Sequence, residues 1–230
     1  MILYVNGDSH TAAAEAVNPH AFAEDDPLLY HLGRQPHPDN LAVSWGKQLA
    51  DRLGYTLYCD AESASSNDRI LRTTKNYLAH NQPDLVVIQW STWEREEWLV
   101  KGQYLQVNAS GIDQVPPSHQ QHYKNYIANI DWRSKTFHAH QSIWQFHNYL
   151  KALNVPHVFF NGNTSFETVV HRYDWGSNYI HPYDSQSTYH AKLSKQFSTV
   201  APDSYHYGPG AHQYWADYLY QYLMDKMYNV

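Results

Sequence analysis

The sequence predicts an α/β fold, a three-layer α/β/α sandwich with a central, mainly parallel sheet. Short β-favouring runs alternate along the chain with longer segments of helical periodicity, which is the pattern of strands joined by crossover helices. The clearest run, Leu85–Trp90, is almost continuously apolar, as in a parallel strand buried on both faces. No internal repeat, linker or low-complexity tract divides the chain. We therefore expect residues 1–230 to form one domain.

Each expected strand is a short run rich in β-branched, aromatic or leucine residues and bounded by turn-forming residues. These strands are residues 2–5, 55–59, 85–90 and 155–161. Pro156 weakens the start of the last one, since it lacks the N–H that a strand interior needs. Ligands of parallel sheets bind beyond the carboxyl ends of the strands. The residues that follow each strand are therefore the first candidates for a site.

Each long expected helix carries apolar residues at three- and four-residue steps. These helices are residues 41–53, 67–79, 119–153 and 210–227. Gly54 is a typical stop for the first helix, and Ser66 is a candidate N-cap for the second. A further short helix is expected at residues 94–98. The other segments lack a clear period and are expected to be loops, with one short helix in the last of them: residues 19–39, 101–118 and 171–200.

The composition excludes several classes of protein. Hydrophobic residues make up 43% and charged residues 17%, a globular balance that rules out wholesale disorder. The net charge of −6 argues against a nucleic-acid partner, because phosphate neutralisation requires a surplus of Lys and Arg. No apolar stretch approaches the roughly 20 residues of a membrane helix. Cys59 is the single cysteine, so neither an intramolecular disulfide nor a thiolate zinc cluster can form.

The amino-terminal residues lack the features of a secretory signal. The first strand begins at residue 2, which leaves no room for the basic region and apolar segment of such a signal. We therefore expect a cytoplasmic protein. Under that expectation the glycosylation pattern at Asn108 carries no meaning. The sequence leaves the oligomeric state open.

Two motifs near the ends of the chain carry the chemistry of a serine nucleophile. Ser9 follows the first strand in the run Asn-Gly-Asp-Ser, and a serine hydroxyl becomes nucleophilic only when a base removes its proton. Near the other end, Asp203 precedes His206 by three residues, just before the last helix. A carboxylate at that spacing can orient the imidazole and leave its far nitrogen for the serine.

In this order the two motifs resemble those of the SGNH (GDSL-type) hydrolase family. The run Gly210-Ala211-His212 adds to the resemblance, although Tyr207 replaces the usual proline and Ala211 separates the glycine from the histidine. The resemblance implies an SGNH hydrolase-like sandwich of flavodoxin-like topology. It also implies an acyl-enzyme mechanism in which Ser9 is the nucleophile, His206 the base and Asp203 the orienting carboxylate. No metal or organic cofactor is implied.

The oxyanion hole that the resemblance implies is where the sequence departs from the family. Family members use the N–H of the serine, the N–H of a glycine after the second strand, and an asparagine after the third. Ala64 occupies the glycine position, and its N–H stays available if its φ is negative. Because no asparagine follows the third strand, the candidate third donors are Ser91 or Thr92, and Asn161 or Asn163 after the fourth strand.

Five further residues are candidates for contact with substrate. His10, beside the nucleophile, is expected at the mouth of the site. Asn67 and Arg69 follow the second strand, although a helix N-terminus explains most of that run. Trp93 and Trp98 lie among charged residues and are expected to form an exposed aromatic platform on which a sugar ring can stack.

Sixteen histidines raise the question of a metal site. His119 and His122 have the spacing of one helix face, but no third ligand follows at a characteristic distance. We therefore expect no metal.

These observations predict a serine esterase acting on short acyl esters, with a carbohydrate O-acetyl ester favoured by the aromatic residues. Its partner would be a small-molecule or glycan ester, with no nucleic acid and no membrane. Two alternatives stay open. One is acyl transfer to a sugar hydroxyl at the same site. The other is a glycan-binding module without turnover, which Ala64 and the missing asparagine favour.

Overall fold

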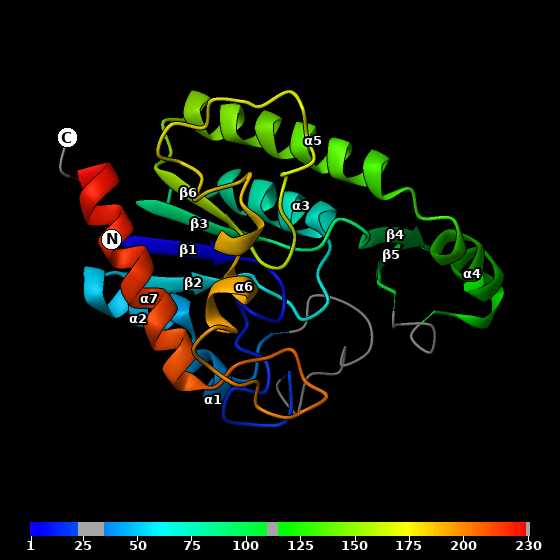
Figure 1. Cartoon of the computed structure of the whole chain (residues 1–230), viewed down its shortest axis with the longest axis horizontal. Helices are drawn as coiled ribbons and strands as arrows, with labels where there is room; N and C mark the ends of the chain where they lie inside the picture. Colours follow the sequence, from blue (N-terminus) through cyan, green and yellow to red (C-terminus); the bar gives the residue numbers. More distant parts are fainter. Residues whose placement is uncertain (23–34, 110–114, 229–230) are drawn as a thin grey trace.

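A four-stranded parallel sheet forms the centre of the computed structural model, which describes residues 1–22, 35–109 and 115–228 (Figure 1). Its strands are β1 (Ile2–Asn6), β2 (Thr56–Cys59), β3 (Leu85–Trp90) and β6 (His157–Asn161). They lie in the order β2-β1-β3-β6. In this register Leu3 of β1 pairs with Leu57 of β2 on one side and with Leu85 of β3 on the other. This is the predicted α/β class. The carboxyl ends of all four strands lie at one edge of the sheet.

Helices cover both faces of the sheet and complete three layers (Figure 1). One layer contains α2 (Trp45–Leu53), α6 (Tyr189–Leu193) and α7 (Pro209–Leu223), with α1 (Pro38–Ala42) beside α2; the other contains α3 (Asn67–Leu78) and α5 (Trp132–Ala152). Alternate strand residues face opposite layers. Leu3 and Val5 pack with the first layer, whereas Tyr4 packs with the second. Each face therefore has its own buried apolar cluster, and the sheet is held from both sides.

Two of the predicted helices are each divided into two shorter helices, the second of which begins at an N-cap residue. The helix expected at residues 41–53 is α1 followed by α2, because the Ser44 hydroxyl accepts a hydrogen bond from Lys47 N (3.1 Å) and starts a new helix. Gly54, at a φ of +68°, ends α2 as predicted. The helix expected at residues 119–153 is α4 (Gln120–Ala128) followed by α5, which Asp131 caps through Ser134 N (3.1 Å).

The segment after β3 differs most from the prediction. In place of a short helix and an irregular stretch, β4 (Glu96–Val100) and β5 (Gln103–Val107) form an antiparallel hairpin. Its turn residues Lys101 and Gly102 both have positive φ, as tight hairpin turns require. The hairpin packs with α4, which the short helix η2 (Pro117–His119) precedes, around the small cluster that contains Leu105 and Tyr123. These elements lie beyond the carboxyl ends of the sheet strands (Figure 1).

The remaining segments agree with the prediction where they are described. Residues 171–200 contain loops, the short helix η3 (Ser185–Ser187) and α6, and the turn η4 (Met224–Tyr228) continues α7. Parts of the loop expected at 19–39 and of the stretch at 101–118 lie outside the described residues. No helix in the described ranges combines the length and the apolar character needed to cross a bilayer.

Candidate active site

Ser9 lies in a tight loop directly beyond the carboxyl end of β1. Thr11 N and Ala12 N both donate to Asp8 O (3.0 Å each), and Ala14 N donates to Ser9 O (2.9 Å). A glycine is required at position 7, because a Cβ there would lie 2.3 Å from the hydroxyl oxygen of Thr11. This packing leaves Ser9 only 7% exposed. The candidate nucleophile is thus held by its backbone.

The Asp8 carboxylate ties this loop to the end of β3. Gln89 Nε2 donates to Oδ1 (2.8 Å), while Ser91 Oγ (2.8 Å) and Arg95 Nη1 (3.0 Å) donate to Oδ2. Burial acts to raise the pKa of Asp8, but the charge of Arg95 and the other donors outweigh burial and lower it. Asp8 is therefore an ionised anchor of the loop. The Ser91 hydroxyl already donates its hydrogen bond to Asp8, so the expectation that it donates to an oxyanion is wrong.

His206 is held by Glu15. Its Nδ1 lies 2.8 Å from Glu15 Oε2, and Ser204 Oγ donates to the same oxygen (2.8 Å) while accepting from His206 N (3.0 Å). A carboxylate on Nδ1 places the ring proton there and leaves Nε2 as the acceptor. Partial burial acts to raise the pKa of Glu15, yet the hydrogen bonds from His206 and Ser204 lower it. Glu15 is therefore ionised at neutral pH.

Glu15 takes the place expected for Asp203. Within the described ranges no hydrogen bond or ion pair joins Asp203 to His206, and Asp203 instead lines a hollow of about 420 Å³ together with Glu15 and Ser204. The reason is local. His206 N is bound by the Ser204 hydroxyl, so the segment does not form the turn that would bring Asp203 back to the imidazole.

The loop of Ser9 and His206 lie close together. The His10 ring centroid is 5.7 Å from that of His206 and 5.0 Å from that of Tyr189. His10 is 4% exposed, so it is packed inside rather than at the mouth of the site as expected. Burial lowers the pKa of His10 to about 4, despite the opposing charge of Asp8. Among the described residues, Ser9 Oγ and His206 Nε2 share no hydrogen bond with each other.

Ala64 and Ser9 present two unused backbone N–H groups. Neither N–H donates to any group in the part of the chain that the structure describes. Their loops are joined, since Glu62 N donates to Gly7 O (3.3 Å). The condition set above for Ala64, a negative φ, is not met: its φ is +68°, in the left-handed region that suits glycine. Ala64 thus adopts a conformation that glycine adopts without strain, at a cost of about 1–2 kcal/mol, and its N–H nevertheless has no partner among the described residues.

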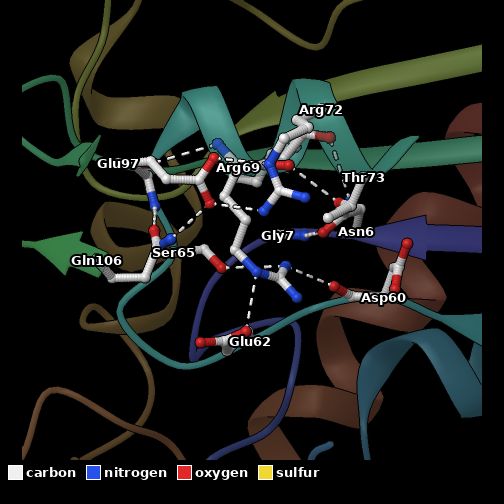
Figure 2. A network of polar contacts seen from close by, with 12 residues as sticks. Asn6, Gly7, Asp60, Glu62, Ser65, Arg69, Arg72, Thr73, Glu97 and Gln106 are labelled. Atoms are coloured by element: carbon white, nitrogen blue, oxygen red, sulfur yellow. Dashed lines mark hydrogen bonds and ion pairs between the residues drawn. The ribbon is translucent and has the colours of Figure 1, made fainter. Parts of the chain in front are cut away.

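A buried polar network holds the loop that carries Ala64 (Figure 2). Arg69, the residue considered above for substrate contact, forms a buried ion pair with Glu62 (2.9 Å) and donates to Asp60 O (2.8 Å). From the hairpin, Gln106 accepts a hydrogen bond from Ser66 N (3.0 Å) at the start of α3. These contacts fix the loop on both sides, and they give Arg69 a structural role.

The other candidates for contact with substrate are Asn67, Trp93 and Trp98. Both ends of the Asn67 side-chain amide bind the backbone of Ser91, so Asn67 clamps the start of α3 to the end of β3. Trp93 is 4% exposed and stacks on Phe166 (4.7 Å between centroids), so it is not part of an exposed platform. Trp98 is half-buried in β4.

The remaining hydroxyl and amide candidates are also accounted for. Thr92 Oγ1 donates to Glu94 (2.8 Å), and the Asn161 side chain accepts from Tyr179 and donates to Pro182 O (3.3 Å). Asn163 is exposed and lines a separate hollow of about 630 Å³. In the described ranges, no group of three or more His, Cys, Asp or Glu residues is placed to hold a metal.

The sequence analysis missed two charged residues of this site, Glu15 and Arg95. Glu15 is the only acid between Asp8 and Glu24, and it interrupts a run of alanines just after the candidate nucleophile. A lone acid so close to a candidate nucleophile is a signal that singles out Glu15 in the sequence. Arg95 lies within a run of charges, and nothing in the sequence distinguishes it from its neighbours.

Comparisons with known proteins bear on the fold. The model of a family described as a family of unknown function, DUF6071, matches residues 30–172, a span that contains neither Ser9 nor His206. Among solved structures, an acetyl xylan esterase (Est2A) from the rumen bacterium Butyrivibrio proteoclasticus is similar with a TM-score of 0.50 and 14% identity, over 98% of this chain and 64% of that one. TesA is similar with a TM-score of 0.50 and 12% identity, over 99% and 100% of the two chains.

These likenesses show a shared, SGNH hydrolase-like fold. The chain spans 64% of the length of the acetyl xylan esterase. No curated protein sequence matches it.

Proposed function

We propose that this chain, which belongs to the DUF6071 family of unknown function, is a serine esterase that cleaves short acyl esters through an acyl-enzyme intermediate. One observation carries the proposal. The N–H groups of Ser9 and Ala64 bind nothing among the described residues, on loops next to a histidine whose Nδ1 is held by Glu15. Two backbone N–H groups without a partner in the described structure, one on a candidate serine nucleophile and one on the adjoining loop, are free to bind an oxyanion.

The proposed reaction has two steps. Ser9 Oγ attacks the ester carbonyl carbon as its proton passes to His206 Nε2, and Glu15 stabilises the imidazolium. The N–H groups of Ser9 and Ala64 bind the oxyanion. His206 then gives its proton to the leaving alcohol. Water attacks the acyl-enzyme with His206 as base, which releases the acid and restores the Ser9 hydroxyl.

An acetyl ester of a carbohydrate is the substrate class that we propose. The acetyl xylan esterase of similar fold acts on such an ester by its name, and this chain carries a candidate nucleophile, Ser9, after its first strand. Among the described residues, the sequence position expected to supply the third oxyanion donor of the family that this chain resembles offers no free side chain, because the Ser91 hydroxyl donates to Asp8. A missing donor typically costs roughly 10²–10³ in turnover. We therefore expect a slow enzyme.

Turnover of a small chromogenic acetyl ester, together with labelling by a serine-directed phosphonate, tests the proposal. We expect hydrolysis and a phosphonyl adduct that mass spectrometry of peptides places on Ser9. Ser9→Ala should lose both. Ser177→Ala, in a hollow on another part of the surface, is the matched control and should keep both. Wild-type protein that neither turns over the ester nor carries an adduct on Ser9 would overturn the esterase proposal.

One observation favours binding of a glycan ester without turnover. Ser9 Oγ makes no hydrogen bond to His206 Nε2 within the described residues, so the proton acceptor is not yet engaged. Hydrogen bonds of this kind often tighten only when substrate is bound. Glycan binding that persists in Ser9→Ala, with no hydrolysis by the wild type, would favour the binding module.

A further inference from the structure

A hollow of about 630 Å³ lies between the start of α5 and the loop that follows β6. Its lining includes Trp132, Arg133, Asn163, Thr164, Glu167 and Ser185, and the buried Trp93 forms part of its wall. Its volume is within the range typical of sites for small ligands. None of these lining residues has a role in the proposed reaction, so the hollow requires its own explanation.

Trp132 is the exposed aromatic residue of this hollow. It is 52% exposed, and in the described part of the chain no aromatic ring or cation packs on its indole. Its backbone is nevertheless fixed, because it is the first residue of α5 and its carbonyl accepts a hydrogen bond from Thr136 Oγ1 (2.7 Å). A large apolar ring on a rigid helix start is therefore presented to solvent beside a concave surface, which is typical of a binding site.

The polar groups of the hollow suit a neutral, hydroxyl-rich ligand. Asn163 is exposed and Ser185 is half-buried, and they offer an amide and a hydroxyl group that both donate and accept hydrogen bonds. Arg133 and Glu167 carry opposite charges, so the lining favours neither an anion nor a cation. A pyranose ring matches this combination, since it presents an apolar face of C–H groups and a rim of hydroxyls.

The position of the hollow relates it to the proposed nucleophile. The carboxyl ends of β1, β3 and β6 lie at one edge of the sheet (Figure 1). Asn163 follows β6 and Trp93 follows β3, so the hollow that they line lies at the same edge as Ser9, which follows β1. In the order β2-β1-β3-β6, β6 lies two strands from β1, on the order of 10 Å.

We infer that this hollow binds a neutral saccharide residue of the substrate through stacking on Trp132. This inference rests on the proposed esterase function, in which the sugar belongs to the alcohol part of the ester and the acyl carbon lies at Ser9. The same saccharide would bind in the absence of catalysis. Binding and turnover can therefore be measured separately.

The test measures binding of xylotetraose and cellotetraose to the Ser9→Ala protein by calorimetry. With Trp132→Ala added, we expect affinity about tenfold weaker, equivalent to about 1.4 kcal/mol. Trp132→Phe, which keeps a ring, should retain most of the affinity. Phe137→Ala is the matched control: Phe137 is 49% exposed on the same helix but lines a neighbouring hollow, and its loss should leave binding unchanged.

The outcomes separate this inference from the proposed function. Equal affinity with and without Trp132, or binding of neither oligosaccharide, would overturn the saccharide site. Hydrolysis of the small chromogenic ester, which does not reach the hollow, should be the same for Trp132→Ala as for the wild type. If that ester is not hydrolysed while Trp132-dependent binding is observed, the esterase proposal fails and the saccharide site stands.

Discussion

Two residues of the candidate site have strained backbone conformations. Glu15 and Ala64 have φ values of +64° and +68°, in the left-handed region that costs a residue with a Cβ about 1–2 kcal/mol. Such strain persists only where the surroundings impose it, and it gathers at functional sites. Here it turns the Glu15 carboxylate to His206 and leaves the Ala64 N–H unpaired. In both cases stability is exchanged for the geometry of the site.

The assignment of Glu15 rather than Asp203 as the orienting acid gives a direct prediction. Glu15→Gln should lower kcat on a small acetyl ester by roughly 10²–10⁴, because the amide no longer fixes the productive tautomer of His206. Asp203→Asn is the matched control, and its kcat should stay within about twofold of the wild type, since Asp203 makes no contact with the imidazole in the described structure. The reverse ranking would assign the role to Asp203.

Ala64→Gly is predicted to stabilise the protein while keeping activity. Glycine adopts a φ of +68° without the steric cost that alanine has, so the free energy of unfolding should rise by about 1 kcal/mol. Ala61→Gly, in the same loop but buried and without a positive φ, should instead lower it. Urea titration of both variants measures the difference. If both glycines destabilise equally, Ala64 is not strained.

At this scale the sequence predicts candidate residues whose signal is local. The turn after the first strand marked Ser9, and the spacing before the last helix marked His206. The isolation of Glu15 in the sequence singles it out, but it does not name His206 as its partner, because the contact spans 191 positions of the chain. The prediction of Asp203 is wrong because proximity in sequence does not by itself place a carboxylate beside the imidazole.

At the scale of elements, local patterns predicted the strands of the sheet and the positions of most helices. The β4–β5 hairpin was not predictable in this way, because its charged residues suggested a solvated helix. In the structure Glu97 binds Arg72 (2.7 Å) and Glu96 binds Lys135, so α3 and α5 hold the hairpin in place. Tertiary ion pairs of this kind override local preference.

The hairpin is predicted to support the loop that carries Ala64, through the side chain of Gln106. This side chain accepts from Ser66 N (3.0 Å) and donates to Glu97 (2.8 Å), and it is 6% exposed. Gln106→Ala leaves a buried N–H unpaired at the start of α3, which should cost about 1–3 kcal/mol of unfolding free energy. Because Ala64 lies two residues before Ser66, kcat should fall as well, with KM nearly unchanged.

Gln103→Ala is the control for the hairpin prediction. Gln103 lies in the same strand, but its side chain is exposed and makes no hydrogen bond in the described structure. Its loss should change neither unfolding nor kcat. If Gln106→Ala lowers stability but leaves kcat equal to that of Gln103→Ala, the hairpin is a structural element without influence on the site.

At the scale of the molecule, the parallel sheet explains how distant motifs meet. β1 lies in the interior of the sheet and α7 packs on one face of it, so the loop after β1 and the loop before α7 reach the same edge (Figure 1). The fold class was predictable because the alternation of strands and helices admits few arrangements. The partner that each loop residue finds at that edge depends on the packed structure, which the pattern does not contain.

The whole molecule is predicted to lose stability between pH 7 and pH 5. Five histidines are buried and have lowered pKa values, chiefly because burial disfavours the charged ring: His10, His140, His147 and His157 at about 4, and His212 at about 3. In the unfolded chain these groups titrate near 6.5. Between about pH 6.5 and 4 the unfolded state therefore binds more protons, so stability falls as the pH falls.

Urea unfolding at pH 7, 6 and 5 measures this dependence. Each buried histidine contributes up to about 1.4 kcal/mol per pH unit, so the free energy of unfolding should decrease by several kcal/mol over the range. The lowered pKa values of Asp8 and Glu15 act in the same direction but only at lower pH, because unfolded carboxyls titrate near 4. His138→Gln, at an exposed position of α5, should leave the slope unchanged. Equal stability at pH 7 and pH 5 would show that the buried imidazoles accept protons in the folded state, and that the interior around these five histidines is more polar than its packing indicates.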